Sequence, residues 1–344
     1  MRLTAILALV VLLAVGVPAL TADGPPGSQG IRLDLEADWA PVYCGRELFL
    51  FSSGGRNQHM GPGDAAPDCA LIQIVPALQP VCAPGGPLAL DRDGTLWKLG
   101  EKTETVLTGL KGAVALFPTE EGPVVLFRRS LRLADGEEAA LPFDAVGGQR
   151  LGTFGFWVRG ADRAARLAPD GTVRWTWTLP KGSPGAAVLA GSRLAAGTSH
   201  GELAVLRDGD GKLLFRYRGG GAVTDPPVVA GDRVVYASVD HFVRAVDVKT
   251  GLLAWQFRAQ GRVAFGPLPV AAGLLFAESP GKRLFILSAD KGKKLWEWPV
   301  PSGAILSRPA VSGDRAAVLA WGEESVPVLY LVALPSSPPR PPKP

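Results

Sequence analysis

The sequence contains few of the residues that most often bind metals. Its 344 residues include three histidines and three cysteines, and Asn57 is the only asparagine. A histidine-rich metal site is therefore excluded by number alone. The cysteines include no close C-x-x-C pair, which is the spacing typical of structural zinc sites, so we expect no metal site.

Signatures of catalysis are also scarce. The sequence has no H-E-x-x-H zinc motif, no P-loop and no dinucleotide-binding glycine fingerprint after a lone strand. We expect no nucleophile elbow either. Most acidic residues stand in turns, as at Asp208, Asp210, Asp232 and Asp314. We therefore predict no catalytic residue and no cofactor.

Charge of one sign is not concentrated in any segment. The chain carries 36 Lys and Arg against 32 Asp and Glu, a net charge of +4. Basic residues are scattered through turns, and no basic run is flanked by exposed aromatics. This pattern argues against nucleic-acid binding.

The sequence has one long hydrophobic run, residues 3–17. It follows a single basic residue and precedes a proline and small residues, which is typical of a secretory signal peptide over residues 1–22, cleaved after Ala19 or Ala22. An uncleaved anchor is the alternative, although a spanning helix needs about twenty apolar residues. No cysteine stands near either cleavage site to carry a lipoprotein anchor. We expect a periplasmic or secreted monomer without stable membrane insertion.

The disulfide candidates are Cys44, Cys69 and Cys82, all near the start of the mature chain. In an oxidising compartment two of them are expected to pair. Cys44 and Cys69 flank a polar, Gly-rich insertion (residues 52–68), and a bridge between them would lower the entropy of that loop. Cys69 with Cys82 is the alternative, and the sequence does not choose between these pairings.

A repeat organises residues 166–334. Four glycines stand 40, 40 and 41 residues apart, and each opens a similar phrase: GTVRWTW at Gly171, GKLLFRY at Gly211, GLLAWQF at Gly251 and GKKLWEW at Gly292. Four residues after each glycine stands a large aromatic: Trp175, Phe215, Trp255 and Trp296. A period near 40 with short segments between turns is typical of a β-propeller blade.

Counting units predicts an all-β protein, a single β-propeller over residues 31–334. Eight four-stranded blades are expected, with seven as the alternative if the two weakest units, residues 40–79 and 82–110, form one blade. The last unit lacks its outermost strand, and residues 31–39 have strand alternation without a partner of their own. We expect this N-terminal strand to complete the last blade and close the ring. Residues 335–344 are rich in proline and predict a disordered tail.

The recurring aromatics predict packing between blades rather than a binding motif. We interpret these aromatics and the four phrase-opening glycines as structural blade anchors. His200 and His241 occupy equivalent turns of neighbouring units, so we interpret them as turn residues rather than ligands. Three tryptophans lie outside this register and could be exposed as a small-ligand or carbohydrate site: Trp39, Trp157 and Trp321.

Phrases such as FVRAVDVKTGLLAWQF and RLFILSADKGKKLWEW resemble the PQQ-like (quinoprotein-type) β-propeller repeat superfamily. The resemblance is good over residues 166–334, fades toward residue 80, and is only architectural before that. The superfamily includes quinoprotein dehydrogenases and the outer-membrane barrel-assembly propeller lipoproteins of Gram-negative bacteria.

The two branches imply different functions. The enzyme branch implies bound pyrroloquinoline quinone, a Ca²⁺ site and a catalytic Asp, and its alcohol dehydrogenases carry two adjacent cysteines, which this sequence lacks. The assembly branch implies short loops on an eight-bladed ring that bind another exported protein, although this sequence lacks the lipobox cysteine. We therefore expect a non-catalytic scaffold whose partner is another exported or envelope protein. A PQQ-dependent dehydrogenase-like enzyme and a carbohydrate or small-ligand binding propeller are the alternatives.

Overall fold

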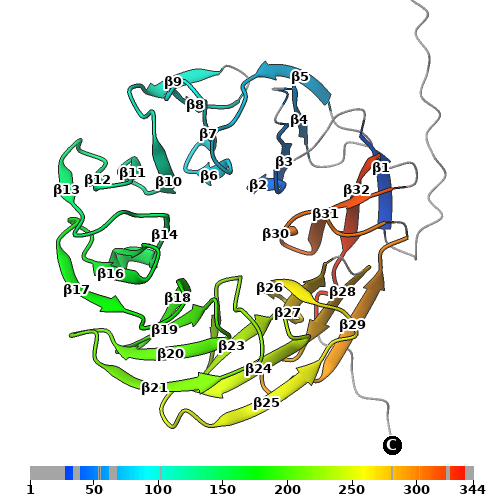
Figure 1. Ribbon diagram of the computed structural model, residues 1–344. Coiled ribbons are helices and arrows are strands. Elements are labelled where there is room, and N and C mark those ends of the chain that lie inside the picture. Colours follow the sequence, from blue (N-terminus) through cyan, green and yellow to red (C-terminus); the bar gives the residue numbers. More distant parts are fainter. Residues whose placement is uncertain are drawn as a thin grey trace, which may run out of the picture.

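The computed structural model of the chain is a ring of eight antiparallel sheets (Figure 1). It describes residues 28–33, 39–52, 54, 56–61, 68–100, 103–279, 282–301, 303–322 and 326–337. Residues 1–22, predicted as a signal peptide, and the end of the predicted disordered tail lie outside these residues. One short 3-10 helix, η1 (Gly152–Phe154), occurs among them. In the part of the chain so described, no helix has the length and apolar character that a membrane crossing requires.

Each blade has four strands, numbered here from the centre of the ring outward. Blade 1 holds β2 (Val42–Cys44), β3 (Glu47–Leu50), β4 (Arg56–Met60) and β5 (Asp68–Gln73). Blade 2 holds β6 (Val81–Ala83), β7 (Gly86–Leu90), β8 (Leu96–Lys98) and β9 (Glu104–Leu107). Blade 3 holds β10 (Ala113–Pro118), β11 (Pro123–Phe127), β12 (Ser130–Arg132) and β13 (Glu138–Ala140). Blade 4 holds β14 (Gly147–Arg150), β15 (Phe156–Arg159), β16 (Arg163–Leu167) and β17 (Val173–Thr178).

The second half of the ring is the more regular one. Blade 5 holds β18 (Pro184–Ala190), β19 (Arg193–Thr198), β20 (Glu202–Arg207) and β21 (Leu213–Arg218). Blade 6 holds β22 (Val228–Ala230), β23 (Arg233–Ser238), β24 (Phe242–Asp247) and β25 (Leu253–Arg258). Blade 7 holds β26 (Val263–Val270), β27 (Gly273–Glu278), β28 (Arg283–Leu287) and β29 (Lys294–Pro299). Blade 8 holds β30 (Ala310–Ser312), β31 (Arg315–Trp321), β32 (Pro327–Ala333) and β1 (Ser28–Arg32).

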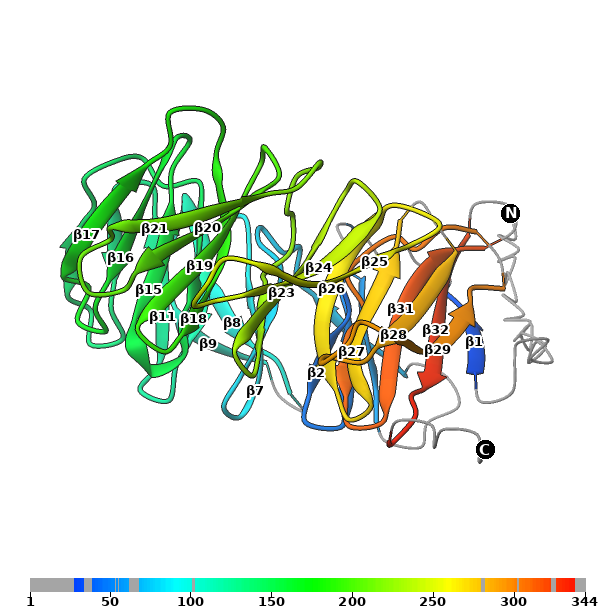
Figure 2. The same cartoon turned by 90° about the horizontal axis from the view of Figure 1, so that it is seen from below.

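The N-terminal strand closes the ring, as the sequence predicts. Strand β1 pairs antiparallel with β32, with Ile31 opposite Leu329, and lies outside it at the edge of the disc (Figure 2). The bounds differ from the expected residues 31–39, because β1 begins at Ser28 and ends at Arg32; residues 34–38 lie outside the described part. Ile31 and Leu33 are buried in a cluster that includes Leu48 of blade 1. Ring closure therefore joins the two ends of the chain by strand pairing within blade 8, and it joins blade 8 to blade 1 by packing.

The weakest predicted units form two separate blades, so the eight-blade prediction is confirmed and the seven-blade alternative is wrong. Part of the polar insertion, expected as a loop, is strand β4, which pairs with β3 at Phe49 and His59. Its apolar signal is weak because Met60 is the only large hydrophobic side chain in it. Pairing within the blade decides this strand rather than intrinsic propensity.

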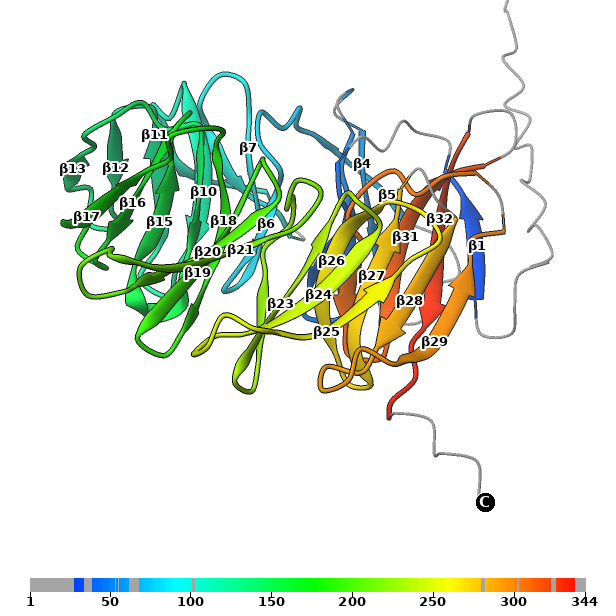
Figure 3. The same cartoon turned by 60° about the horizontal axis from the view of Figure 1, so that its bottom comes forward.

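The hydrophobic core lies between blades. The outer strand β17 shows the alternation that this requires, since Trp175 and Trp177 are buried while Arg174 and Thr176 are exposed. Those two indoles pack in one cluster with β19 and β20 of blade 5. Each blade thus buries its faces against its neighbours, and the outer strands β21, β25 and β29 follow one another along the rim (Figure 3).

The antiparallel order gives the ring two faces. The turns between first and second strands and between third and fourth strands lie on one face, which we name the turn face. The turns between second and third strands and the connections from one blade to the next lie on the opposite face, which we name the connection face. Short turns of several blades therefore meet on each face, where propellers have their variable residues.

Candidate functional site at the seam between the first and last blades

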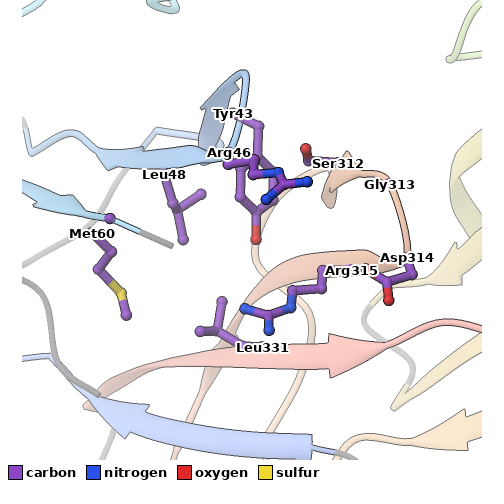
Figure 4. Close-up of a pocket in the computed structure, with 10 residues that line it drawn as sticks. Tyr43, Arg46, Leu48, Met60, Ser312, Gly313, Asp314, Arg315 and Leu331 are labelled. Carbon is purple, nitrogen blue, oxygen red and sulfur yellow. The ribbon is translucent and has the colours of Figure 1, made fainter. Parts of the chain in front are cut away.

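A pocket of about 500 Å³ opens on the turn face between blades 8 and 1. Its floor is apolar, and two arginines and a tyrosine stand around it; Figure 4 shows Arg46 and Arg315 approaching from opposite blades. The lining residues are Tyr43, Arg46, Leu48, Met60, Gly61, Ser312, Gly313, Asp314, Arg315 and Leu331. The Ser312 hydroxyl donates a hydrogen bond to the Gly45 carbonyl oxygen (2.6 Å), which ties the two blades together beside the pocket.

The pocket lies where a contact between an arginine and the next blade, which recurs in blades 5 and 6, is not made within the described part of the chain. Arg193 and Arg233 stand at the start of the second strands of blades 5 and 6, and their guanidinium groups donate to the carbonyl oxygens of Val248 and Asp290 in the next blade. Arg315 has the equivalent position in blade 8, but the described residues supply it with no such acceptor and with no carboxylate within 4 Å. Burial raises the pKa of Tyr43, and the charge of Arg315 opposes this shift. The seam can therefore receive an anionic group above an apolar floor.

The disulfide joins Cys44 and Cys82, whose Cα atoms are 5.3 Å apart. Both predicted pairings, Cys44 with Cys69 and Cys69 with Cys82, are wrong. Cys44 and Cys82 lie on β2 and β6, the innermost strands of neighbouring blades, whereas Cys69 lies on β5 at the outer edge. The sequence did contain a signal, because a separation of 38 residues is close to the repeat period and places the two cysteines on equivalent strands of neighbouring blades.

The letters of the nucleophile-elbow pattern do occur, at residues 197–201, so the expectation that the sequence has none is wrong. The Ser199 hydroxyl lies 3.3 Å from Nδ1 of His200, and it accepts a hydrogen bond from the Ser183 backbone N–H (2.9 Å). Residues 199–201 form a turn between strands β19 and β20, whereas an elbow joins a strand to a helix. No carboxylate contact to His200 occurs among the described residues. We therefore interpret the pair as turn residues.

The other histidines also stand in structural settings. His241 has a φ of 71° and is the one non-glycine residue in the described ranges with positive φ, which suits the turn role predicted from its register. His59 lies 3.5 Å from a Glu47 carboxylate oxygen and against the ring of Phe49. Over the described ranges, no group of three or more His, Cys, Asp or Glu side chains is placed to hold a metal ion.

The repeated aromatics meet the phrase-opening glycines of the next blade. A Cβ added at Gly211 would lie 2.6 Å from the Trp175 ring, and one at Gly251 would lie 2.9 Å from the Phe215 ring. Gly171 faces Ala139 of β13 in blade 3 instead of an aromatic ring. Their function as blade anchors stays a prediction.

The three tryptophans outside the register do not form one site. Trp157 is fully buried and its Nε1–H donates to the Gly185 carbonyl oxygen (3.0 Å) in blade 5, so the expectation of exposure is wrong for it. Trp39 packs half-buried on the core of blades 1 and 2. Trp321 is 42% exposed at the end of β31.

Comparison with known proteins agrees with the repeat. Residues 160–324 match a family model described as Outer membrane protein assembly factor BamB. The proteins of that name from Burkholderia pseudomallei (strain K96243) and Bordetella pertussis (strain Tohama I) are 29% identical over 153 residues and 27% identical over 145 residues. These matches cover 42% and 38% of this chain, and 39% and 37% of the relatives.

Solved structures confirm the architecture alone. The computationally designed Ika8 protein has a TM-score of 0.69 at 11% identity, covering 88% of this chain and 98% of its own. Saccharomyces cerevisiae Sqt1 has a TM-score of 0.66 at 11% identity, covering 89% of this chain and 98% of its own. The repeat phrases, the eight-bladed ring and the family match together show that the chain resembles the PQQ-like β-propeller superfamily and, within it, the outer-membrane barrel-assembly branch.

Proposed function

We propose that this chain is a non-catalytic exported β-propeller that acts as a protein-interaction scaffold in the assembly of outer-membrane proteins. The match of residues 160–324 to the assembly-factor family carries this proposal. The two curated relatives are named as assembly factors, and the matched stretch spans about two fifths of their length. The partner of such a scaffold is another exported or envelope protein.

The architecture supports a scaffold in a second way. Most loops that can be described are two to five residues long, so each face presents many short turns rather than a roof over a buried cofactor. Such a surface suits the docking of a macromolecule. The enzyme alternative would need the quinone and Ca²⁺ ligands of the dehydrogenase branch.

Affinity capture tests the proposal against the enzyme alternative. The tagged full chain is incubated with envelope extract, and proteins retained above an untagged control are identified; enrichment of outer-membrane assembly components is expected. In parallel, purified protein is titrated with pyrroloquinoline quinone and Ca²⁺ while its absorbance is recorded. Saturable quinone binding without enrichment of envelope proteins would contradict the proposal.

The seam pocket favours a second candidate, a small-ligand binding propeller. Its volume of about 500 Å³ is in the range of small-molecule sites. Arg46 and Arg315 would select ligands with an anionic group and an apolar body. Loss of binding of such ligands in R46A/R315A would support this candidate.

A further inference from the structure

A set of basic side chains lies along one arc of the connection face in blades 4 to 7. We name it the basic arc, and it consists of Lys181, Arg218, Arg258, Arg262 and Lys282. Arg218 and Arg258 end the outer strands β21 and β25. Lys181 and Arg262 stand in connections between blades, and Lys282 stands between β27 and β28. All five are exposed.

Backbone hydrogen bonds hold these segments together on one face. The Ser279 N–H donates to the Arg262 carbonyl oxygen (3.0 Å), and the Val300 N–H donates to the Lys282 carbonyl oxygen (2.7 Å). The Ala259 N–H, next to Arg258, donates to the His241 carbonyl oxygen (2.8 Å). Three of the five members therefore stand in or next to segments that a backbone hydrogen bond ties to a neighbouring strand or turn.

The carboxylates of this face in blades 5 to 7 are occupied by the fold itself. Glu202 contacts Arg216 and Arg218 at 3.8 and 3.3 Å. Asp240 pairs with Arg244 at 2.7 Å and accepts the Gly220 N–H at 2.9 Å. Each carboxylate is at most 20% exposed.

Two further carboxylates point inward. Asp225 pairs with Arg308 and accepts the Gly266 N–H (2.6 Å). Glu278 is buried and accepts the N–H groups of Gln260 and Gly261 at 3.1 and 2.9 Å. These two carboxylates bind groups in the connections between blades. Their negative charge therefore does little to neutralise the exposed cations of the basic arc.

The basic arc therefore keeps an excess of positive charge. Lys181, Arg258, Arg262 and Lys282 have no carboxylate within 4 Å in the described ranges, and the Arg218 side chain is 82% exposed despite its contact with Glu202. Uncompensated charges of one sign on a rigid surface attract and orient a partner of opposite charge.

Two features favour an acidic polypeptide over an anionic lipid surface. Three of the five cations are arginines, whose planar guanidinium groups bind carboxylates through two hydrogen bonds. Interfacial membrane binding gains from apolar side chains that insert between lipids. Within blades 5 to 7 the exposed large hydrophobics of the described residues stand toward the turn face, for example Leu214 and Leu252, whereas Trp321 at the end of β31 lies on the connection face in blade 8.

We propose that the basic arc is the docking surface for an acidic segment of the partner protein. This inference rests on the proposed scaffold function and adds the chemistry and the place of the contact.

The test uses the purified full chain and a fluorescent glutamate-rich peptide of about 20 residues. Binding is measured by anisotropy for the wild type, for R258E/R262E, and for K212E/K293E. The last variant reverses two exposed lysines on the turn face and matches the change in charge. Circular dichroism and thermal unfolding verify that both variants fold.

The wild type is expected to bind with an affinity that falls about tenfold between about 50 and about 200 mM NaCl. R258E/R262E is expected to weaken binding by about tenfold or more, and K212E/K293E by less than about threefold. Equal losses in both variants, or no binding at low salt, would overturn the inference. So would binding to vesicles containing about one third phosphatidylglycerol in the absence of peptide binding.

Envelope capture with R258E/R262E separates this inference from the proposed function. Reduced capture of the same partner supports the basic arc. Unchanged capture overturns the basic arc while leaving the scaffold function standing.

Discussion

Gly292 lies directly against the indole of Trp255 in the preceding blade. A Cβ added at Gly292 would come within 2.3 Å of the ring, and the residue has a φ of 64°. Trp255 also donates its Nε1–H to the Ala289 carbonyl oxygen (3.2 Å) of the same turn. The glycine and the aromatic of the repeated phrase are therefore two halves of one contact between neighbouring blades. This explains why they recur together.

Replacing Gly292 by alanine is expected to lower the free energy of unfolding by about 3 kcal/mol. The positive φ contributes about 1 kcal/mol of this and the clash with the indole contributes the rest. Gly231 is a matched control, since its φ is 61° and a Cβ there would have no neighbour within 4 Å. Urea unfolding of both variants measures the difference, and equal losses would contradict the contact.

Trp255→Ala is expected to lower the free energy of unfolding by about 2–3 kcal/mol, because the half-buried indole and its hydrogen bond are both lost. Trp255→Phe should recover part of this loss. Binding of the acidic peptide by the folded fraction should not change. Unchanged thermal unfolding of Trp255→Ala would show that the aromatic is not an anchor.

The stability of blade 6 should depend on pH through Asp240. Burial alone would raise its pKa, but hydrogen bonds from Arg244, Ser238 and the Gly220 N–H outweigh this and lower the pKa from 3.8 to about 2. A lowered folded-state pKa stabilises the fold above about pH 4, and this contribution is lost as the pH falls toward about 2.

Asp240→Asn should therefore be less stable than the wild type by roughly 2 kcal/mol at pH 7. The difference in unfolding free energy should shrink steadily between about pH 4 and about pH 2. Denaturant unfolding of both proteins at several pH values measures it. A difference that stays constant over this range would show that the carboxylate charge does not stabilise the blade.

The Cys44–Cys82 bond should leave Cys69 as the one free thiol. Denatured protein without reductant is expected to take up one alkylating group per chain, and the Cys69→Ser variant none, as measured by intact mass. Removing the bond in C44S/C82S should cost about 2–4 kcal/mol, since the bond closes a loop of 38 residues. Labelling of Cys44 or Cys82 in the unreduced wild type would contradict this pairing.

The repeat predicted the architecture because each Gly-aromatic phrase is a local signal for a turn and its outer strand. Strand β4 was missed because Arg56–Met60 is polar and flanked by glycines, so only its pairing with β3 reveals it. The closing strand was placed a few residues late because alternation continues past Arg32. The disulfide was predicted wrongly because the loop between Cys44 and Cys69 favoured that pairing, whereas the repeat period relates Cys44 to Cys82.

The candidate sites were less predictable than the fold. The seam pocket brings Tyr43 and Arg46 beside Arg315, residues that are far apart in the chain and meet only when the ring closes. The basic arc could not be predicted, because the sequence does not show which charged side chains form ion pairs in the fold. In the sequence, Lys181 and Arg262 are ordinary turn residues. Only the structure shows that the carboxylates of Asp225 and Glu278 accept backbone N–H groups.

The central claim is that this chain is a scaffold for outer-membrane protein assembly. Deleting the gene and restoring it tests this claim most directly. The abundance of outer-membrane β-barrel proteins is measured by quantitative proteomics in the source strain, in a strain lacking this gene, and in that strain carrying the full chain. We predict a lower abundance of several barrel proteins on deletion and recovery with the full chain. An unchanged outer-membrane protein profile on deletion would contradict the account.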